Sequence, residues 1–280
     1  PYIEKIPGSR WLKAIREEYP NFNIVGECWT RPAPAVAYWQ SGTKNFDGFD
    51  SNLPCVMDFP VEEAIRQALE NDGNYWGGGL TKVYDALTMD YMYGDIYNVL
   101  TFLGNHDMSR IRDAVKDKDI RRVKLAYVLL ATMRGIPQVL YGDEYAMISA
   151  NKEDVNNHSY LRAPLPLGDE VTEEMQNMYD FQSRLFNWRK DEPVLHYGKT
   201  MHFLARNNTY AYFRYNEKEA VFVFANASEE PRVIPTATYK EILGRYNAVG
   251  FNPLTGEQID LNREDIEVKG LSTMIVKLTK

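Results

Sequence analysis

The sequence has few of the features that mark disulfide-rich, membrane-spanning or nucleic-acid-binding proteins. It holds only two cysteines in 280 residues, Cys28 and Cys55, and neither lies in a CxxC or zinc-type spacing. It lacks the run of about 18 apolar residues that a membrane-spanning helix needs. It also lacks the basic patch of a nucleic-acid-binding surface, and its formal net charge is −7. We therefore expect two buried, unpaired cysteines, no membrane span and no nucleic-acid partner.

The composition is that of an ordinary globular protein. Hydrophobic residues make up 44% and charged residues 25% of the chain, which is typical of folded domains, and the length predicts roughly two domains. Aromatic residues are plentiful, with 19 Tyr, 12 Phe and 5 Trp. Both sugar-binding clefts and protein cores use such rings, so composition alone does not choose between these two roles.

Strands and helices alternate through the first 190 residues or so. Apolar segments rich in β-branched residues predict four buried strands, at 22–26, 54–59, 98–103 and 137–141. Amphipathic segments predict helices at 9–19, from Pro60 onward, and at 80–93, 120–134 and 173–189. Ser9 is the expected N-cap of the first helix, Pro60 suits a first helical turn, and Gly135 is the expected C-cap of the fourth. Such alternation implies an α/β fold with a parallel sheet, and four strands are half of an eight-stranded β/α barrel.

The pattern changes after Glu192. Short β-rich segments follow one another with turn signals between them, at 210–215, 220–225 and 273–278 and near Val233, Ile242 and Ile259. Short strands at this spacing predict a small antiparallel β-sandwich. We therefore expect two domains, 1–192 as the barrel half and 193–280 as an all-β domain.

Polar residues follow the first and third predicted strands. In a β/α barrel the carboxyl ends of the strands carry the active site, and these positions hold Glu27 and the segment 105–107. A carboxyl group in an apolar strand end tends to have a raised pKa because desolvation penalises its charged form, and such an acid donates protons at neutral pH. Glycoside hydrolysis needs a proton donor and a second carboxylate near the developing oxocarbenium ion. Glu27 and Asp107 fit these roles, and His106 fits a hydrogen-bond donor to a sugar hydroxyl.

Other roles fit the same residues. A glutamate at a strand end is more often a helix cap or an ion-pair partner, and an Asn-His-Asp run alone indicates little. Glu, His and Asp are also metal ligands, although the sequence has no HExxH motif or close His pair. From the residues alone these alternatives stay open.

Four segments together resemble the alpha-amylase family. Residues 25–29, Val-Gly-Glu-Cys-Trp, look like its acid-bearing segment, and residues 101–107, Thr-Phe-Leu-Gly-Asn-His-Asp, look like its later Asn-His-Asp segment. Residues 135–144 resemble its eighth-strand segment, and residues 52–60 resemble the sixth-strand region of the neopullulanase and cyclomaltodextrinase branch. Four matches in order are far more specific than any one of them.

The resemblance implies the second half of a (β/α)8 TIM barrel, strands five to eight, followed by a C-terminal β domain. It implies cleavage of α-glucosidic bonds in starch-like glucans with retention of configuration. Glu27 would be the general acid/base and Asp107 the carboxylate that stabilises the transition state. Four side chains would bind or orient the substrate: Asn105, His106, Trp29 and Arg110.

The sequence departs from the family pattern in two places. The nucleophilic Asp of the family lies in a Gly-x-Arg-x-Asp pattern, which is absent here and would fall just upstream of Pro1. We therefore expect a fragment that is inactive alone, and the open edges of a half barrel favour association with another copy. The family branch also has an Asp-Phe-Pro-Gly-type segment where this chain has residues 157–164. His158 and Arg162 there either line the cleft or belong to a surface loop.

The resemblance requires no cofactor; calcium is compatible with it, but this segment does not indicate a calcium site. The partner would be an α-glucan oligo- or polysaccharide, and the compartment would be periplasmic or extracellular. A non-catalytic glucan-binding protein of amylase-like fold is the alternative, although a pure binder has no need of the proton donor Glu27. A transglycosylase of the same family differs only in how water is excluded.

Overall fold

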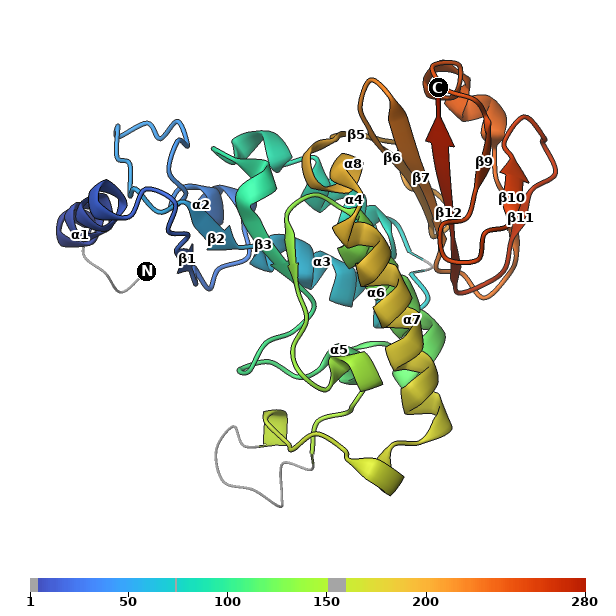
Figure 1. Ribbon diagram of the computed structural model, residues 1–280, viewed down its shortest axis with the longest axis horizontal. Coiled ribbons are helices and arrows are strands. Elements are labelled where there is room, and N and C mark those ends of the chain that lie inside the picture. Colours follow the sequence, from blue (N-terminus) through green and yellow to red (C-terminus); the bar gives the residue numbers. More distant parts are fainter. Residues whose placement is uncertain (1–4, 74, 151–159) are drawn as a thin grey trace.

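The chain folds into an α/β part followed by antiparallel β-sheets, as the computed structural model in Figure 1 shows. The structure describes residues 5–73, 75–150 and 160–280. In this view the antiparallel strands lie at the opposite end of the molecule from the N-terminal helix, and the longer helices stand between them and the first sheet.

The first sheet has four parallel strands in chain order. They are β1 (Val25–Gly26), β2 (Cys55–Met57), β3 (Val99–Phe102) and β4 (Ile136–Gln138). Each strand pairs in parallel with the next, as Val56 does with Val99 and Leu100 does with Ile136. Strands joined by helical crossovers in this order are those of a β/α barrel, so the predicted half barrel is confirmed.

Helices fill the connections. They are α1 (Lys5–Glu18), α2 (Ala33–Ala37), α3 (Phe59–Leu69), α4 (Thr81–Leu87), α5 (Ile111–Ala114), α6 (Ile120–Thr132), α7 (Glu173–Lys190), α8 (Pro193–Tyr197) and α9 (Lys240–Leu243). Short 3₁₀ turns occupy Asp90–Met92, Ile96–Asn98, Lys116–Lys118, Asp143–Tyr145, Gly168–Glu170 and Thr236–Tyr239. Asp58 caps α3 by accepting a hydrogen bond from the Val61 amide at 3.4 Å, and Pro60 lies in the first turn as expected. Within the described ranges, every helix is too short or too polar to traverse a bilayer.

The C-terminal part consists of antiparallel sheets. The larger has six strands in the order β10-β9-β12-β7-β6-β5, and β11 pairs with β8 in a two-stranded sheet. The strands are β5 (Lys199–His202), β6 (Thr209–Tyr215), β7 (Glu219–Asn226), β8 (Arg232–Val233), β9 (Val249–Phe251), β10 (Gln258–Asp260), β11 (Glu267–Val268) and β12 (Ser272–Thr279). Phe213, Phe222 and Phe224 form an apolar core on one face, and the predicted β-sandwich is confirmed. The domain boundary after residue 192 stays a prediction.

The two parts share one hydrophobic core. Buried residues of α6, such as Val123 and Leu130, cluster with Val221 and Val223 of β7. A hydrogen bond of 2.5 Å joins Thr132 on α6 to the Tyr212 hydroxyl on β6. The antiparallel sheet therefore stabilises the helical layer that supports the parallel strands.

Four local expectations need correction. Helix α1 begins at Lys5, so Ser9 lies inside it, and its hydroxyl donates to the Asp50 carbonyl at 3.0 Å instead of capping the helix. Residues 29–53, with aromatic residues among Gly, Ser and Asp, are expected from the sequence to form a long loop, but they contain α2. Ile242 lies in α9, not in a strand, and short apolar runs do not separate helix from strand by periodicity.

The fourth correction concerns Gly135, which the sequence predicts to be the C-cap of α6. Met133 is the C-cap of α6, and Gly135 has φ +93° at the start of β4. A Cβ at Gly135 would lie 2.6 Å from the Val99 carbonyl oxygen. Glycine is thus required by the close approach of β3, not by the helix end.

Among the described residues β1 pairs only with β2, and β4 only with β3, so both outer edges of the first sheet are open. Association with another copy through these edges stays a prediction.

Cys28 and Cys55 are buried and unpaired, as expected. Burial raises the pKa of both thiols to about 11.

Candidate active site

The residues predicted to carry chemistry follow the carboxyl ends of the parallel strands. Glu27 comes directly after β1, the segment 105–107 follows β3, and Asp143 follows β4. Parallel strands end at the same edge of a sheet, and neighbours lie about 4.8 Å apart. Because β2 separates β1 from β3, the carboxyl ends of β1 and β3 are about 10 Å apart. Long acidic side chains at that separation can lean toward one substrate bond.

An aromatic stack joins the ends of the first three strands. The Trp29 ring stacks on Phe59 with centroids 5.1 Å apart, and Phe59 packs edge-on against Phe102 at 5.1 Å. Phe59 and Phe102 are buried, whereas 44% of Trp29 is exposed. The stack holds Trp29 rigid with part of its ring open to solvent, which suits the apolar face of a sugar ring.

Glu27 is exposed, contrary to the desolvated position expected from its neighbours. Its neighbour Cys28 points into the core, so the alternation of the strand end directs Glu27 to the open side. No segment in the described part of the chain covers its carboxyl group. Desolvation of Glu27 therefore requires a substrate or a further segment.

The loop after β3 arranges its three polar residues tightly. The buried Asn105 side chain accepts a hydrogen bond from the Asp107 amide at 2.9 Å. The His106 Nε2 atom lies 3.3 Å from Asp107 Oδ2, and both side chains remain accessible, at 56% and 31% exposure. The Asn105 amide nitrogen is buried without a partner among the described residues. Asn105 thus shapes the loop while His106 and Asp107 face outward.

Arg162, from a later segment of the chain, contacts this loop. Its Nη2 atom is 2.5 Å from Asp107 Oδ1, and its Nε atom donates to the His106 carbonyl at 3.0 Å. The sequence left Arg162 between a cleft and a surface position, and the structure places its guanidinium group against Asp107. His158, the other residue singled out in this region, lies outside the described residues.

A buried ion pair ties the loop after β3 to the segment after β4. The fully buried Arg110 donates to Asp143 Oδ1 at 2.7 Å and to the Tyr141 carbonyl at 2.8 Å. The Tyr127 hydroxyl donates to the other Asp143 oxygen at 3.1 Å. Burial raises the pKa of Asp143 to about 6, against the lowering effect of Arg110. Arg110 has no exposed surface. Its orienting role stays a prediction, and the ion pair with Asp143 is the contact through which it would act.

Replacing Arg110 by Met tests this pair. Arg110→Met leaves the Asp143 carboxylate buried without its cation, which costs about 3–5 kcal/mol of stability at pH 7. Losing Arg110 raises the pKa of Asp143 further, so the folded state binds a proton more tightly than the unfolded state does. The stability that protonation supplies is present at low pH and is lost as pH rises through the folded pKa. Denaturant unfolding should therefore show a smaller loss at pH 5 than at pH 7.

The matched control is Arg245→Gln, which breaks an exposed pair with Glu241 at 3.2 Å. It should cost less than about 1 kcal/mol at both pH values. Equal losses at pH 5 and pH 7 for Arg110→Met would contradict the role given to Asp143.

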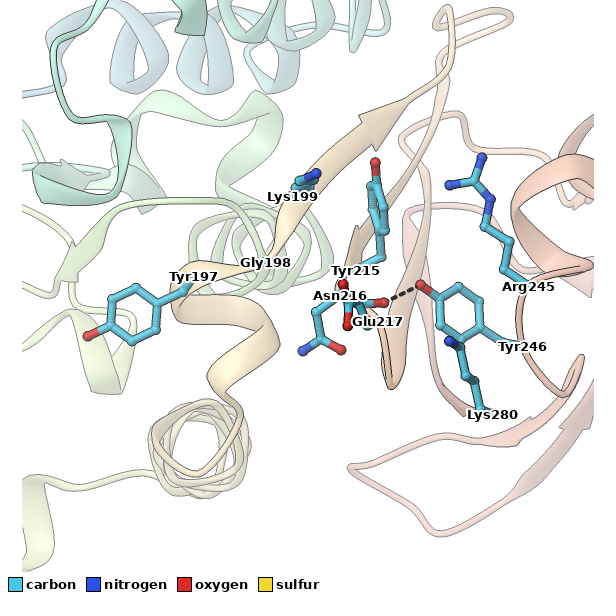
Figure 2. Close-up of a pocket in the computed structure, with 9 residues that line it drawn as sticks. All are labelled: Tyr197, Gly198, Lys199, Tyr215, Asn216, Glu217, Arg245, Tyr246 and Lys280. Carbon is cyan, nitrogen blue, oxygen red and sulfur yellow. Dashed lines mark hydrogen bonds between the residues drawn. The ribbon is translucent and has the colours of Figure 1, made fainter.

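A pocket lies apart from the candidate site. A hollow of about 520 Å³ lies beside β5 and β6. Figure 2 shows Tyr215, Arg245 and Tyr246 on one side of it and Tyr197 on the other. None of the candidate catalytic residues lines it. In the described ranges, no group of three or more His, Cys, Asp or Glu side chains is placed to hold a metal ion.

The fold is that of a partial β/α barrel followed by antiparallel sheets, and comparison with known proteins gives the family. Residues 8–225 match the family described as alpha amylase, catalytic domain. The chain therefore belongs to the alpha-amylase family, as its motifs indicated. Residues 200–277 match the family described as cyclo-malto-dextrinase C-terminal domain.

Individual proteins similar to this chain carry names that agree with the family assignment. A cyclomaltodextrin glucanotransferase from Geobacillus stearothermophilus is 25% identical over 247 residues, covering 84% of this chain and 32% of the relative. An alpha-amylase from Niallia circulans is 26% identical, covering 88% of this chain and 44% of the relative. The solved alpha-amylase from Geobacillus thermoleovorans, complexed with acarbose, superposes with a TM-score of 0.77 at 19% identity, covering 100% of this chain and 58% of that chain. The chain thus spans less than half the length of these two curated relatives.

Proposed function

We propose that the chain supplies the general acid/base and the transition-state-stabilising carboxylate of an enzyme that cleaves α-glucosidic bonds with retention. One observation carries the proposal: Glu27 and the segment 105–107 follow parallel strands at the same sheet edge in a chain of the alpha-amylase family. Glu27 would protonate the leaving oxygen and later deprotonate the attacking water. Asp107 would stabilise positive charge on the sugar ring, and His106 would hold its hydroxyls.

The covalent step would need a carboxylate that residues 1–280 do not supply in the family pattern. Retaining hydrolysis proceeds through a glycosyl-enzyme intermediate on a nucleophilic carboxylate, and the Gly-x-Arg-x-Asp pattern is absent. We propose that a further segment provides both this nucleophile and the missing half of the barrel. The partial coverage of the solved relative, 58% of its chain, supports this arrangement.

The substrate would be a starch-like α-glucan of oligo- or polysaccharide length. The C-terminal match to cyclo-malto-dextrinases supports the cyclomaltodextrinase and neopullulanase branch. The compartment would be periplasmic or extracellular. Transglycosylation is a second candidate, because several relatives are cyclomaltodextrin glucanotransferases. The two reactions differ in whether water or a sugar hydroxyl takes the glycosyl group, and product analysis separates them.

The first experiment compares residues 1–280 with a longer polypeptide that contains them and the rest of a barrel. We expect reducing-sugar release from soluble starch, pullulan or cyclodextrin by the longer polypeptide and none by residues 1–280 alone. Activity of residues 1–280 alone would mean that the nucleophile is misplaced. Glucan binding without turnover by either polypeptide would favour the alternative of a non-catalytic glucan-binding protein.

A further inference from the structure

Arg66, on helix α3, holds both ends of the loop that carries Asp107. Its Nη1 atom donates to the Leu103 carbonyl at 3.1 Å and to the Ser109 carbonyl at 2.8 Å, and its Nη2 atom donates to the Ser109 hydroxyl at 2.6 Å. Residues 103 and 109 bracket the segment 104–108, which contains the His106 and Asp107 side chains. One guanidinium fork thus closes the base of the loop.

The fork is itself held in place. The Arg66 side chain is only 16% exposed, and its Nε atom lies 3.2 Å from the carboxylate of Glu62, one turn earlier on α3, which is 2% exposed. A guanidinium group has a rigid planar geometry, so less freedom is lost for each hydrogen bond it forms than for a lysine ammonium group. Helix α3 is packed in the main core through Val61 and Ile65. Arg66 therefore anchors the loop to a fixed element of the fold.

The loop has little regular structure of its own. It lies between the end of β3 at Phe102 and the start of α5 at Ile111. Its internal hydrogen bonds include one of 2.9 Å between Asn105 and Asp107 and one of 3.3 Å from the Met108 amide to the Asn105 carbonyl. Arg162 contacts its tip, and is 47% exposed. Arg66 is the more buried of these two arginine anchors, and it acts on the backbone.

We infer that Arg66 is a positioning residue for Asp107: it sets the loop geometry that places this carboxylate beside the cleaved bond. This inference rests on the proposed function. A displacement of about 1 Å of a catalytic group can cost about 10²-fold in rate, and Lys at position 66 keeps the charge but loses the fork.

Arg189 on α7 provides a matched control. It is also a buried helix arginine, 5% exposed, and it donates to the Ala131 carbonyl at 2.6 Å and the Gly135 carbonyl at 2.8 Å. These carbonyls lie in the last turn of α6 and directly before β4, at the amino end of that strand and so away from the candidate site at the carboxyl ends. Arg189→Lys therefore makes the same chemical change away from Asp107.

The experiment measures kcat, KM and Tm for Arg66→Lys and Arg189→Lys in the longer polypeptide, with maltooligosaccharides well below Tm. Both variants should lower Tm. Arg66→Lys should lower kcat about 10- to 100-fold with little change in KM, and Arg189→Lys should leave kcat per folded molecule unchanged. Equal kcat values for the two variants would overturn the inference. Ser109→Ala, which removes only the hydroxyl acceptor, should give a smaller loss of kcat and serves if Arg66→Lys does not fold.

Hydrogen exchange of residues 1–280 separates this inference from the proposed function. Amides of residues 103–109 should exchange faster in Arg66→Lys and at the wild-type rate in Arg189→Lys, whether or not the protein has activity. Unchanged exchange in Arg66→Lys would remove Arg66 from its role. Full activity of Asp107→Asn in the longer polypeptide would overturn the role of Asp107 in the proposed function. Faster loop exchange in Arg66→Lys would then still show that Arg66 holds the loop.

Discussion

Glu27→Gln is expected to lower turnover of glucans with poor leaving groups by at least about 10²-fold, the usual scale of general acid catalysis. Glutamine keeps the shape of the side chain but has no acidic proton to give to the leaving oxygen. The measurement is kcat on maltooligosaccharides in the longer polypeptide. A substrate with an activated leaving group needs less proton donation, so its first bond cleavage should be far less affected.

Glu63→Gln is the control for this change. Glu63 lies on α3 and pairs with Arg31 at 2.8 Å, and the proposed mechanism does not use this ion pair. It should leave kcat within about twofold of wild type, as expected for a surface substitution. Near-normal turnover in Glu27→Gln would remove Glu27 from the acid/base role.

The sequence predicted the elements whose signals are local. Buried β-branched runs predicted the four parallel strands within a few residues, and Pro60 marked the start of α3 because proline suits a first helical turn. Because parallel strands end at one edge, the positions of Glu27 and Asp107 after β1 and β3 followed from the same pattern. Family membership then rested on four short segments, which the comparison over residues 8–225 confirms.

The contacts that shape the candidate site have no local signal. Arg66 and Ser109 are 43 positions apart, Arg162 and Asp107 are 55 apart, and nothing in either segment specifies the other. Glu27 shows the same limit: its apolar neighbours suggested burial, but its exposure depends on which segments cover the strand end. Such pairings are fixed only when the chain is folded.

Arginines hold the acidic strand ends from different elements. Arg66 reaches the loop after β3 from α3, and Arg110 joins that loop to Asp143 after β4 at 2.7 Å. Carboxylates gathered at one edge repel one another, and the buried cations offset this repulsion. Within the described part of the chain, Glu27 forms no ion pair. The arrangement leaves the Glu27 carboxyl group open for the proton transfer proposed above.

Asp107→Asn is expected to lower kcat by about 10²–10³-fold, the scale seen when a preorganised electrostatic group is removed, while glucan binding persists. Asparagine keeps the size and the hydrogen-bonding oxygen of the side chain but loses the negative charge that would stabilise the oxocarbenium ion. That charge develops only in the transition state, so its loss should appear in kcat and not in the dissociation constant. Calorimetric titration with a maltooligosaccharide, beside steady-state kinetics of the longer polypeptide, measures both.

Asp117→Asn is the matched control, because it makes the same change ten positions along the chain at an exposed residue with φ 56°, a conformation that Asn tolerates well. It should alter neither kcat nor affinity. Asp107→Asn also weakens the contact with Arg162, whose freed guanidinium could itself disturb substrate. The double variant Asp107→Asn with Arg162→Gln distinguishes these effects: if kcat stays low in it, the missing charge of Asp107 is the cause. Recovery to the wild-type rate in the double variant would contradict the electrostatic role.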